Sequence, residues 1–220
     1  MDNEIISKSN TIIWSRHDLS LIEQKIVLFA ISKLSKIDYI SRFTMVEFLD
    51  SIDCITTRHS EIRQKIENLK DKELSFFDKT LDNKIVYHKI KWCDKVICNT
   101  GGIVELRINK LIIPHFLWIK NDFSIYKLKN IMKLRKKYAI RLYEILNVYP
   151  KKRKQKFLVK ELRTLLANSD SYKRFSSFES RVIMAGIEEI NSKTDIFITY
   201  TKTKRGRSVW EIEFKIKKLT

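Results

Sequence analysis

Glycine and proline are scarce in this sequence, which contains 4 Gly and 2 Pro among 220 residues. Such a low content excludes collagen-like chains and low-complexity segments rich in these residues. Hydrophobic residues, by contrast, make up 44% of the chain, and aromatic residues make up 11%. The composition is therefore typical of a globular protein, and the length allows one large domain or two of about 100 residues each.

Long hydrophobic runs are also missing. The longest unbroken run of aliphatic and aromatic residues extends only from Ile26 to Ile31, whereas a membrane-spanning helix needs about 20 apolar residues. The chain begins with Met-Asp-Asn-Glu, without the basic region, apolar stretch and small-residue cleavage site of a secretory signal. We therefore expect a cytoplasmic protein that does not span a membrane.

Residues that could build a disulfide, a metal site or a phosphate loop are few and poorly spaced. An odd number of cysteines in a cytoplasmic protein favours buried thiols over a disulfide framework, and no second cysteine or histidine pair offers a zinc site. A Gly-rich loop of the Walker type does not occur. We expect no catalysis, no metal and no cofactor. The residues considered are Cys54, Cys93, Cys98, His17, His59, His88 and His115.

Negative charge is low, so the formal net charge is +18. Residues 122–220 hold 25 Lys and Arg against 10 Asp and Glu, a net charge of +15, and residues 1–121 hold 19 against 16, a net charge of +3. A balance this basic favours attraction to a polyanion, either nucleic acid or an anionic membrane surface. We expect the carboxy-terminal half to make most of these contacts.

Three helices are predicted in the first half. Asp18 or Ser20 can cap a helix over residues 19–34, in which apolar residues recur at intervals of three and four. A short helix over 44–51, a polar turn and a helix over 60–72 follow. Three segments then alternate β-branched or aromatic residues with polar ones, which predicts an antiparallel meander. These segments are 74–80, 85–93 and 103–108.

The second half repeats this order of elements. A long helix is predicted over residues 129–149, followed by helices over 158–167 and 176–192. A hairpin then pairs residues 196–201 with residues 209–216. Two short helices followed by a hairpin are typical of the winged helix, in which the second helix enters the major groove and the hairpin lies along the DNA backbone.

The two halves can be overlaid, which indicates a duplicated module. Phe43 and Glu47 fall on Phe157 and Glu161, and the apolar residues of the two recognition-type helices align in the same order. The sequence therefore predicts an α+β protein of two tandem winged-helix domains, residues 1–121 and residues 122–220. The second domain is expected to be the main DNA-binding domain.

Candidate DNA contacts in the second domain lie at the start of its second helix and in its hairpin. Arg can bind guanine through two hydrogen bonds, Ser can bond to several base edges, and Glu can accept from cytosine. Cations around a glycine suit phosphates or a narrow minor groove. Any single one of these residues is equally explained as a solvated surface group. The candidates are Arg174, Ser176, Ser177, Glu179, Ser180, Arg181, Lys202, Lys204, Arg205 and Arg207.

The first domain offers a smaller set of candidates. Arg58 and Arg63 lie at the start of its second helix, where they can contact DNA. Thr56 and Thr57 are better explained as ordinary helix caps, and His59 as an exposed polar residue. The low net charge of this half favours an auxiliary contact.

Several segments resemble a known family. Residues 138–144, Tyr-Ala-Ile-Arg-Leu-Tyr-Glu, are similar to a signature of the initiator replication proteins of iteron-containing, theta-replicating plasmids. Residues 172–195 resemble the recognition helix and following strand of that family, residues 204–207 resemble its wing, and residues 19–25 resemble its opening helix. The resemblance extends over nearly the whole chain.

The resemblance implies a function that composition and residue spacing alone do not indicate. Members of this family bind direct repeats at the origin as monomers, help to open an AT-rich segment, and recruit the host initiator and helicase. Their dimers, joined through the amino-terminal domain, repress their own gene at an inverted repeat, so a homodimer in equilibrium with the monomer is expected. Such a protein associates with plasmid DNA in the nucleoid.

The resemblance also assigns roles to individual residues. Arg174 and Arg181 match basic residues that meet bases, whereas Arg141, Tyr143 and Glu144 match a motif that we interpret as structural. Glu179 and Ser180 occupy positions where some relatives have Arg. The DNA sequence of the repeat that this chain recognises can therefore differ from that recognised by those relatives.

Three alternatives have different sequence requirements. A rolling-circle initiator needs a closely spaced metal-binding histidine pair and a nucleophilic Tyr, and the four histidines here are far apart. A winged-helix transcriptional regulator without an initiation role would have the same sequence features as an initiator. Only the family resemblance separates the two. A membrane-surface protein would carry its basic residues on one amphipathic helix, whereas here they fall on a winged-helix pattern.

Overall fold

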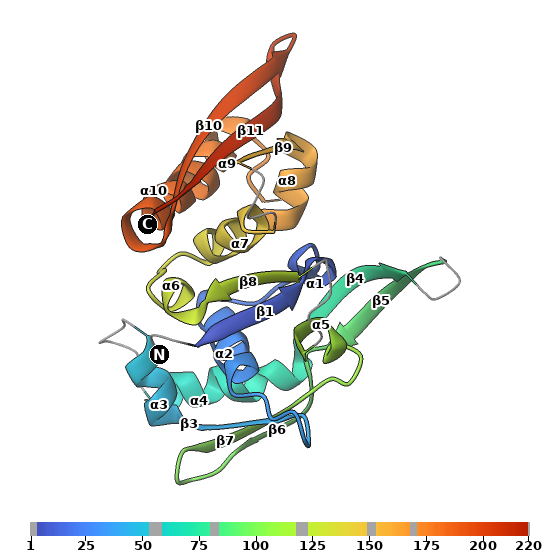
Figure 1. Ribbon diagram of the computed structural model, residues 1–220, viewed down its shortest axis with the longest axis vertical. Coiled ribbons are helices and arrows are strands. Elements are labelled where there is room, and N and C mark those ends of the chain that lie inside the picture. The colour runs from blue at the N-terminus through green and yellow to red at the C-terminus, as the bar shows by residue number, and fades with distance from the viewer. Residues whose placement is uncertain are drawn as a thin grey trace. The chain divides into compact units, whose positions relative to one another are not determined.

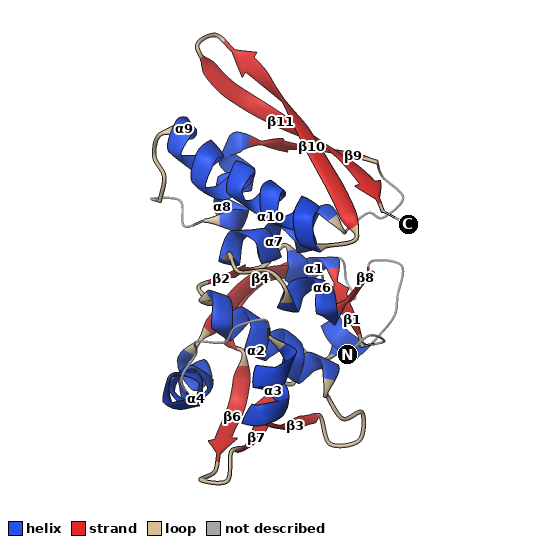
Figure 2. Cartoon of the chain, turned by 90° about the vertical axis from the view of Figure 1, so that its left-hand side faces the viewer, coloured by secondary structure: helices blue, strands red, loops and turns tan. Residues whose placement is uncertain are grey.

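The computed structural model describes residues 4–52, 59–79, 84–117, 123–148, 153–167 and 171–219. The chain forms two compact units, Met1–Lys133 and Leu134–Thr220, which we describe separately. Figure 1 shows the order of elements in each unit, and Figure 2 shows how helices and strands are distributed. None of the helices in the described ranges is long and apolar enough to cross a bilayer.

Two helices of the first unit begin with a reciprocal side-chain capping arrangement. Ser20 caps α2 (Leu21–Ser32): it accepts a hydrogen bond from the Glu23 N–H, and the Glu23 carboxylate accepts one from the Ser20 N–H. Thr44 and Glu47 form the same arrangement at α3 (Met45–Ser51). The other helices are α1 (Asn10–Ile13), α4 (His59–Asn68), α5 (Pro114–Leu117) and α6 (Leu128–Met132).

The strands in the described part of this unit form three small sheets. The sheet with order β3-β7-β6 packs against α2, α3 and α4, where Phe29 makes edge-to-face contacts with Phe43 and Phe48, at 5.1 and 5.6 Å between ring centres. The other sheets have orders β2-β4-β5 and β1-β8. Their strands are β1 (Ile5–Ser9), β2 (Arg16–His17), β3 (Ile40–Thr44), β4 (Glu73–Lys79), β5 (Ile85–Lys91), β6 (Cys93–Cys98), β7 (Ile103–Ile108) and β8 (Phe123–Lys127).

The prediction of one meander over residues 74–108 was wrong. The predicted strand over 85–93 ends at Lys91, and a new strand of a different sheet starts at Cys93. Trp92 lies between the two strands, and its side chain is buried. Its N–H donates to the Lys72 carbonyl, and its carbonyl accepts from the Asn109 N–H. The strand predicted over 103–108 is confirmed with the same bounds.

Residues 123–133 belong to the first unit because of a long-range pairing. Strand β8 pairs antiparallel with β1, with Ile5 opposite Lys127 and Ser9 opposite Phe123. The ammonium group of Lys25, on buried helix α2, donates to the Met132 carbonyl at 2.7 Å. The units therefore divide after Lys133, whereas the sequence-based boundary lies between residues 121 and 122.

The second unit has the element order of a winged helix. Helices α7 (Lys137–Leu146) and α8 (Val159–Leu166) precede a long helical segment made of α9 (Phe175–Phe178), the π-type turn η2 (Glu179–Met184) and α10 (Ala185–Lys193). The sheet has the order β10-β11-β9, and its strands are β9 (Lys154–Leu158), β10 (Ile196–Arg205) and β11 (Ser208–Lys218). We call residues 175–193 the recognition helix and the β10–β11 hairpin the wing.

The long helix predicted over residues 129–149 is broken, so that prediction was wrong. Helix α6 ends at Met132 and α7 begins at Lys137. Between them, the Glu189 carboxylate accepts hydrogen bonds from the N–H groups of Arg135 and Lys136, at 2.7 and 3.0 Å. A carboxylate at this end of α7 satisfies donors that have no carbonyl partner within the helix.

The recognition helix packs closely on α7. Phe178, Val182 and Ile190 are fully buried on its inner side. A Cβ atom on Gly186 would lie 3.4 Å from the Leu142 side chain and 3.7 Å from the Ala139 backbone, so this position of the recognition helix faces α7 at van der Waals distance. The helix predicted over 176–192 is confirmed as the continuous segment 175–193.

The interpretation of the Tyr-Ala-Ile-Arg-Leu-Tyr-Glu segment as structural is confirmed. Arg141 and Glu144 are buried in α7 and form an ion pair at 3.1 Å. The Tyr143 hydroxyl donates to the Asp195 carboxylate at 2.9 Å, which ties α7 to the start of β10. Arg141, Tyr143 and Glu144 are buried inside the unit, and their polar groups have hydrogen-bond partners there.

Candidate nucleic-acid interface

The outer side of the recognition helix is polar and accessible. Arg174, which immediately precedes α9, is exposed, and so are Ser176, Ser180 and Arg181. The predicted candidate Ser177 is half-buried. The exposed side chains share a helix whose opposite face forms the core, so they can reach the floor of a groove without disturbing packing.

The centre of the recognition helix is a π-type turn, η2. This wider turn contains Val182 and Ile183, both fully buried, and it leaves Arg181 and Met184 outside, Met184 with 52% of its surface exposed. Such turns are rare and often occur at functional sites. Met184 was missed by sequence reasoning because an apolar residue in an apolar-periodic helix predicts core.

An ion pair joins the recognition helix to the wing. The Glu179 carboxylate accepts from Lys202 at 2.8 Å and from the Tyr200 hydroxyl at 2.6 Å. Burial alone would raise the pKa of Glu179, but the hydrogen bonds from Lys202 and Tyr200 outweigh it and lower that pKa. Burial and the same carboxylate raise the pKa of Tyr200. Lys202 also lies over the Phe175 ring, at 5.9 Å from its centre.

This arrangement gives Glu179 and Lys202 a role that the sequence did not suggest. One carboxylate oxygen of Glu179, predicted to accept from cytosine, already holds the wing. Lys202, predicted to meet phosphate, is the partner of that oxygen. The clamp of Glu179, Tyr200 and Lys202 fixes the start of the recognition helix against the wing, so both present their exposed residues together.

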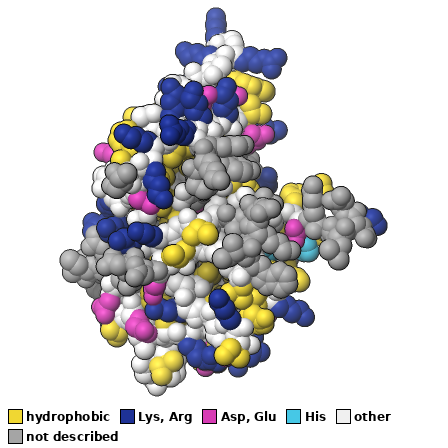
Figure 3. All heavy atoms as spheres, viewed as in Figure 1, with side chains coloured by type: hydrophobic (Ala, Val, Ile, Leu, Met, Phe, Trp, Pro, Cys, Tyr) yellow, Lys and Arg dark blue, Asp and Glu magenta, His cyan; other side chains and the backbone are white. Residues whose placement is uncertain are grey.

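The tip of the wing is a cluster of exposed cations. Lys204, Arg205 and Arg207 surround Gly206, whose φ of +62° belongs to the left-handed region that glycine adopts without strain. Every residue from Thr201 to Ser208 is exposed. In Figure 1 the hairpin extends beyond the helices, and Figure 3 shows Lys and Arg side chains gathered at its tip.

Arg163 supports the start of the recognition helix from α8. Its guanidinium donates to the Lys173 carbonyl at 2.9 Å and lies 5.2 Å from the centre of the Phe178 ring. Sequence reasoning did not identify this residue. The available signal was the single arginine on the helix that precedes the turn, but its position in the sequence does not reveal that its side chain reaches the Lys173 carbonyl and the Phe178 ring.

The first unit uses its candidate arginine differently. The Arg63 guanidinium, on α4, donates to the carbonyls of Cys98 and Asn99 at 3.1 and 2.8 Å. It therefore holds α4 against the end of β6, and the side chain is half-buried. Arg58, together with Thr56 and Thr57, lies outside the described residues. His59 is exposed, as expected.

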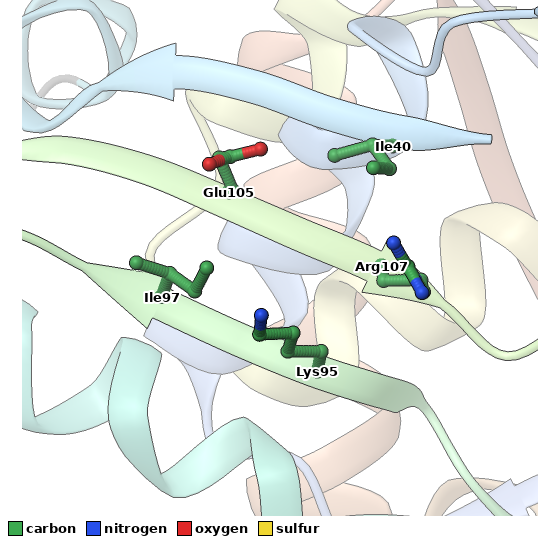
Figure 4. A pocket seen from close by; sticks show the side chains of 5 residues that line it. All are labelled: Ile40, Lys95, Ile97, Glu105 and Arg107. Carbon is green, nitrogen blue, oxygen red and sulfur yellow. The ribbon is translucent and has the colours of Figure 1, made fainter. Parts of the chain in front are cut away.

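A shallow pocket of about 110 Å³ lies on the outer side of the β3-β7-β6 sheet. Figure 4 shows that its side chains come from all three strands; they are Ile40, Lys95, Ile97, Glu105 and Arg107. Pockets that hold cofactors or drug-sized ligands have volumes of about 300 to 1,000 Å³. This hollow is too small and too open for such a ligand.

A serine, a histidine and an aspartate meet in the first unit without forming a catalytic arrangement. The Ser9 hydroxyl lies 2.8 Å from His115 Nδ1, and the Asp78 carboxylate lies 3.8 Å from Nε2. In a Ser-His-Asp triad the serine bonds to Nε2 and the carboxylate to Nδ1. Ser9 is moreover buried and caps α1 by accepting from the Ile12 N–H, so this group is structural.

The described cysteines have the properties of structural thiols. Burial, with Asp94 nearby, raises the pKa of the Cys93 thiol to about 12. Burial also raises the pKa of Cys98, which is half-buried. Cys54 lies outside the described residues. Within the described ranges, no group of three or more His, Cys, Asp or Glu side chains is arranged to hold a metal ion.

Two family models match the sequence. The model for an initiator replication protein, WH1, matches residues 5–147. The model for an initiator Rep protein, WH2, matches residues 158–216. The two matches follow one another along the chain and confirm the predicted α+β architecture of two tandem winged-helix domains.

The fold is similar to that of two solved proteins. One is the Pi initiator protein, solved in complex with iteron DNA, with a TM-score of 0.75, 17% sequence identity, and coverage of 98% of this chain and 98% of that chain. The other is a structure of domains 2 and 3 of RctB, with a TM-score of 0.56, 11% identity, and coverage of 100% of this chain and 93% of that chain. At these identities the likeness concerns the fold alone.

Proposed function

Because the chain belongs to the initiator replication protein family, we propose that it binds repeated duplex sites at a plasmid origin and initiates replication there. The observation that carries the proposal is the joint presentation of the recognition helix and the wing by the clamp of Glu179, Tyr200 and Lys202. A structural neighbour, the Pi initiator protein, was solved with iteron DNA, which supports the same kind of ligand here.

The recognition helix would enter the major groove of each repeat. Arg174, just before the helix, and Arg181, in η2, are exposed and can form paired hydrogen bonds with guanine, while Ser176 and Ser180 can bond to several base edges. The wing would lie along the flanking backbone, where Lys204 and Arg207 meet phosphates. The high positive charge would add affinity for any duplex through release of counterions.

Binding would lead to initiation without catalysis by this chain. We propose that the bound protein helps to open an AT-rich segment and brings the host initiator and helicase to it, so that ATP hydrolysis belongs to those partners and no cofactor is needed here. By the same family relationship, the protein would repress its own gene. It would act in the cytoplasm, bound to the plasmid.

The first unit would carry the dimer contact. Strands β4 and β5 expose large apolar side chains at neighbouring positions: Phe77 and Tyr87 lie opposite one another, with ring centres 5.2 Å apart, and are 66% and 56% exposed. Exposed apolar patches commonly mark interaction surfaces. We propose that two copies meet on this hairpin in equilibrium with the monomer.

The proposal is tested by selection followed by replication. The purified full chain is used to select duplexes from a random library, and the enriched sequence is compared with repeats beside the gene. A minimal plasmid with these repeats and the gene should replicate, and deletion of either should abolish replication. Enrichment of no sequence would overturn the proposal, and binding to an inverted repeat without any effect on replication would favour a transcriptional regulator.

A further inference from the structure

Trp210 is a large aromatic residue that is half exposed in the most cationic part of the molecule. It lies on β11 within the wing, and 48% of its surface is exposed. The Arg205 guanidinium carbon lies 5.2 Å from the centre of its ring. A guanidinium over an indole face is held by the ring quadrupole and by planar stacking, and Trp is the best ring for this contact.

A β-bulge in the wing places Trp210 at this position. Thr203 is opposite Glu211, and the next residue, Lys204, is opposite Val209, so Trp210 is the extra residue of β11 with no partner on β10. Bulges locally bend a strand and re-aim side chains. The irregularity occurs between the clamped base of the wing and its tip, where Arg205 is opposite Ser208.

The charge around Arg205 is not neutralised within residues 171–219. Glu211 and Glu213, the nearest acidic residues on β11, both pair with Lys156 at 3.4 and 3.5 Å. Glu179 pairs with Lys202. The contact of Arg205 with Trp210 therefore orients the guanidinium while leaving its charge available to an anion.

We propose that Trp210 is a positioning residue that holds Arg205 for insertion into the narrow minor groove of an A·T-rich segment beside the bases that the recognition helix reads. A-tracts have a narrow minor groove whose enhanced negative potential attracts Arg. A guanidinium that is already oriented loses less rotamer freedom on insertion than a free one. The inference rests on the proposed function and adds to it a source of shape-dependent specificity at the wing.

The test compares two duplexes of equal length, one containing an A-tract and the other rich in G·C, with the full chain. Wild-type protein should prefer the A-tract duplex. Trp210→Leu should reduce that preference about two- to fivefold, the factor expected for an exposed cation–π contact, and Trp210→Phe should retain most of it. Lys204→Ala is the matched control, because loss of a phosphate contact should weaken binding to both duplexes equally.

A double-mutant cycle separates positioning from a general effect of the ring. If Trp210 acts through Arg205, Trp210→Leu should cause no further loss of preference in an Arg205→Ala background. Additive losses, or a preference that survives Trp210→Leu, would overturn the inference while leaving duplex binding intact. Failure of the wild-type protein to bind either duplex would instead contradict the proposed function.

Discussion

The two winged-helix units join their second helix to their hairpin by different chemistry. In the first unit, Arg63 on α4 donates to two backbone carbonyls, those of Cys98 and Asn99. In the second, an acidic residue on the helix, Glu179, accepts from two side chains of the wing, Lys202 and Tyr200. The first arrangement uses a helix cation internally, whereas the second leaves the helix cations Arg174 and Arg181 exposed.

The hairpins of the two units also differ in charge. The hairpin of the first unit ends in Asn99, Thr100, Gly101 and Gly102, without charge, and its sheet carries mixed charges such as the pair of Arg42 with Glu105 at 3.2 Å. The wing of the second unit ends in Lys204, Arg205 and Arg207. Function therefore depends on surface residues of a shared scaffold, and the second unit has the surface suited to a polyanion.

The largest expected effect tests whether each unit has its own core. Phe178 is fully buried beneath the recognition helix, so Phe178→Ala should lower the free energy of unfolding by about 3 to 5 kcal/mol. Hydrogen exchange should show the loss at amides of the second unit. Phe48→Ala, at a fully buried position of the first unit, is the matched control, and equal losses in both units for either variant would contradict separate cores.

The next effect concerns one arginine on the second helix of each unit, Arg63 on α4 and Arg181 on the recognition helix. Arg181→Ala should weaken binding to a selected duplex by about 1 to 3 kcal/mol and relax base choice. Arg63→Ala should instead lower the stability of the first unit by about 1 kcal/mol, since two backbone acceptors lose their donor. Titration of both variants with selected and scrambled duplexes distinguishes the two roles. If Arg63→Ala changed base choice as much as Arg181→Ala, the two arginines would not have different roles.

The connection in the second unit should depend on pH, because Glu179 holds it. The folded state lowers the pKa of Glu179 below its ordinary value of 4.5, so its contribution is present above that value and is lost as the pH falls through the lowered pKa. The free energy involved is about 1 kcal/mol because Lys202 is partly exposed. Glu179→Gln should remove this part of the acid dependence of unfolding, and identical acid profiles for the variant and the wild type would refute it.

The smallest effect is on the salt dependence of binding. Lys204→Ala should reduce the slope of log affinity against log salt by about one, because one phosphate contact is lost. Lys110→Ala removes an exposed lysine of the first unit and should leave the slope unchanged. Equal changes in slope for the two variants would indicate that charge acts without regard to its place in the fold.

Local patterns predicted the main helices of each winged helix and several of its strands, whereas β1, β2, β3, β8 and β9 were not predicted. The alternation of apolar residues located α2, α3, α4 and the recognition helix, and the strand over Ile103–Ile108 was found with its observed bounds. These elements have one buried face, so their periodicity appears in the sequence. The cations of the wing were identified for a different reason: an exposed run of charged residues can be recognised in a sequence without knowledge of packing.

Contacts between residues far apart in the sequence could not be predicted from such local patterns. The pairing of β8 with β1 and the cap of α7 by Glu189 join residues far apart in sequence, and they determine where the first unit ends and where the predicted long helix breaks. The internal partners of Glu179 and Arg63, which lie on the neighbouring hairpin, were likewise not predictable from sequence; their predicted contacts with DNA remain predictions.

Nuclease footprinting of the repeats beside the gene tests the central claim most directly. Wild-type protein should protect each repeat, and an Arg174→Ala, Arg181→Ala double variant should lose that protection while it retains weak, sequence-independent binding through the wing. If the double variant still protects the repeats as the wild type does, the recognition helix of the second unit is not the element that reads them.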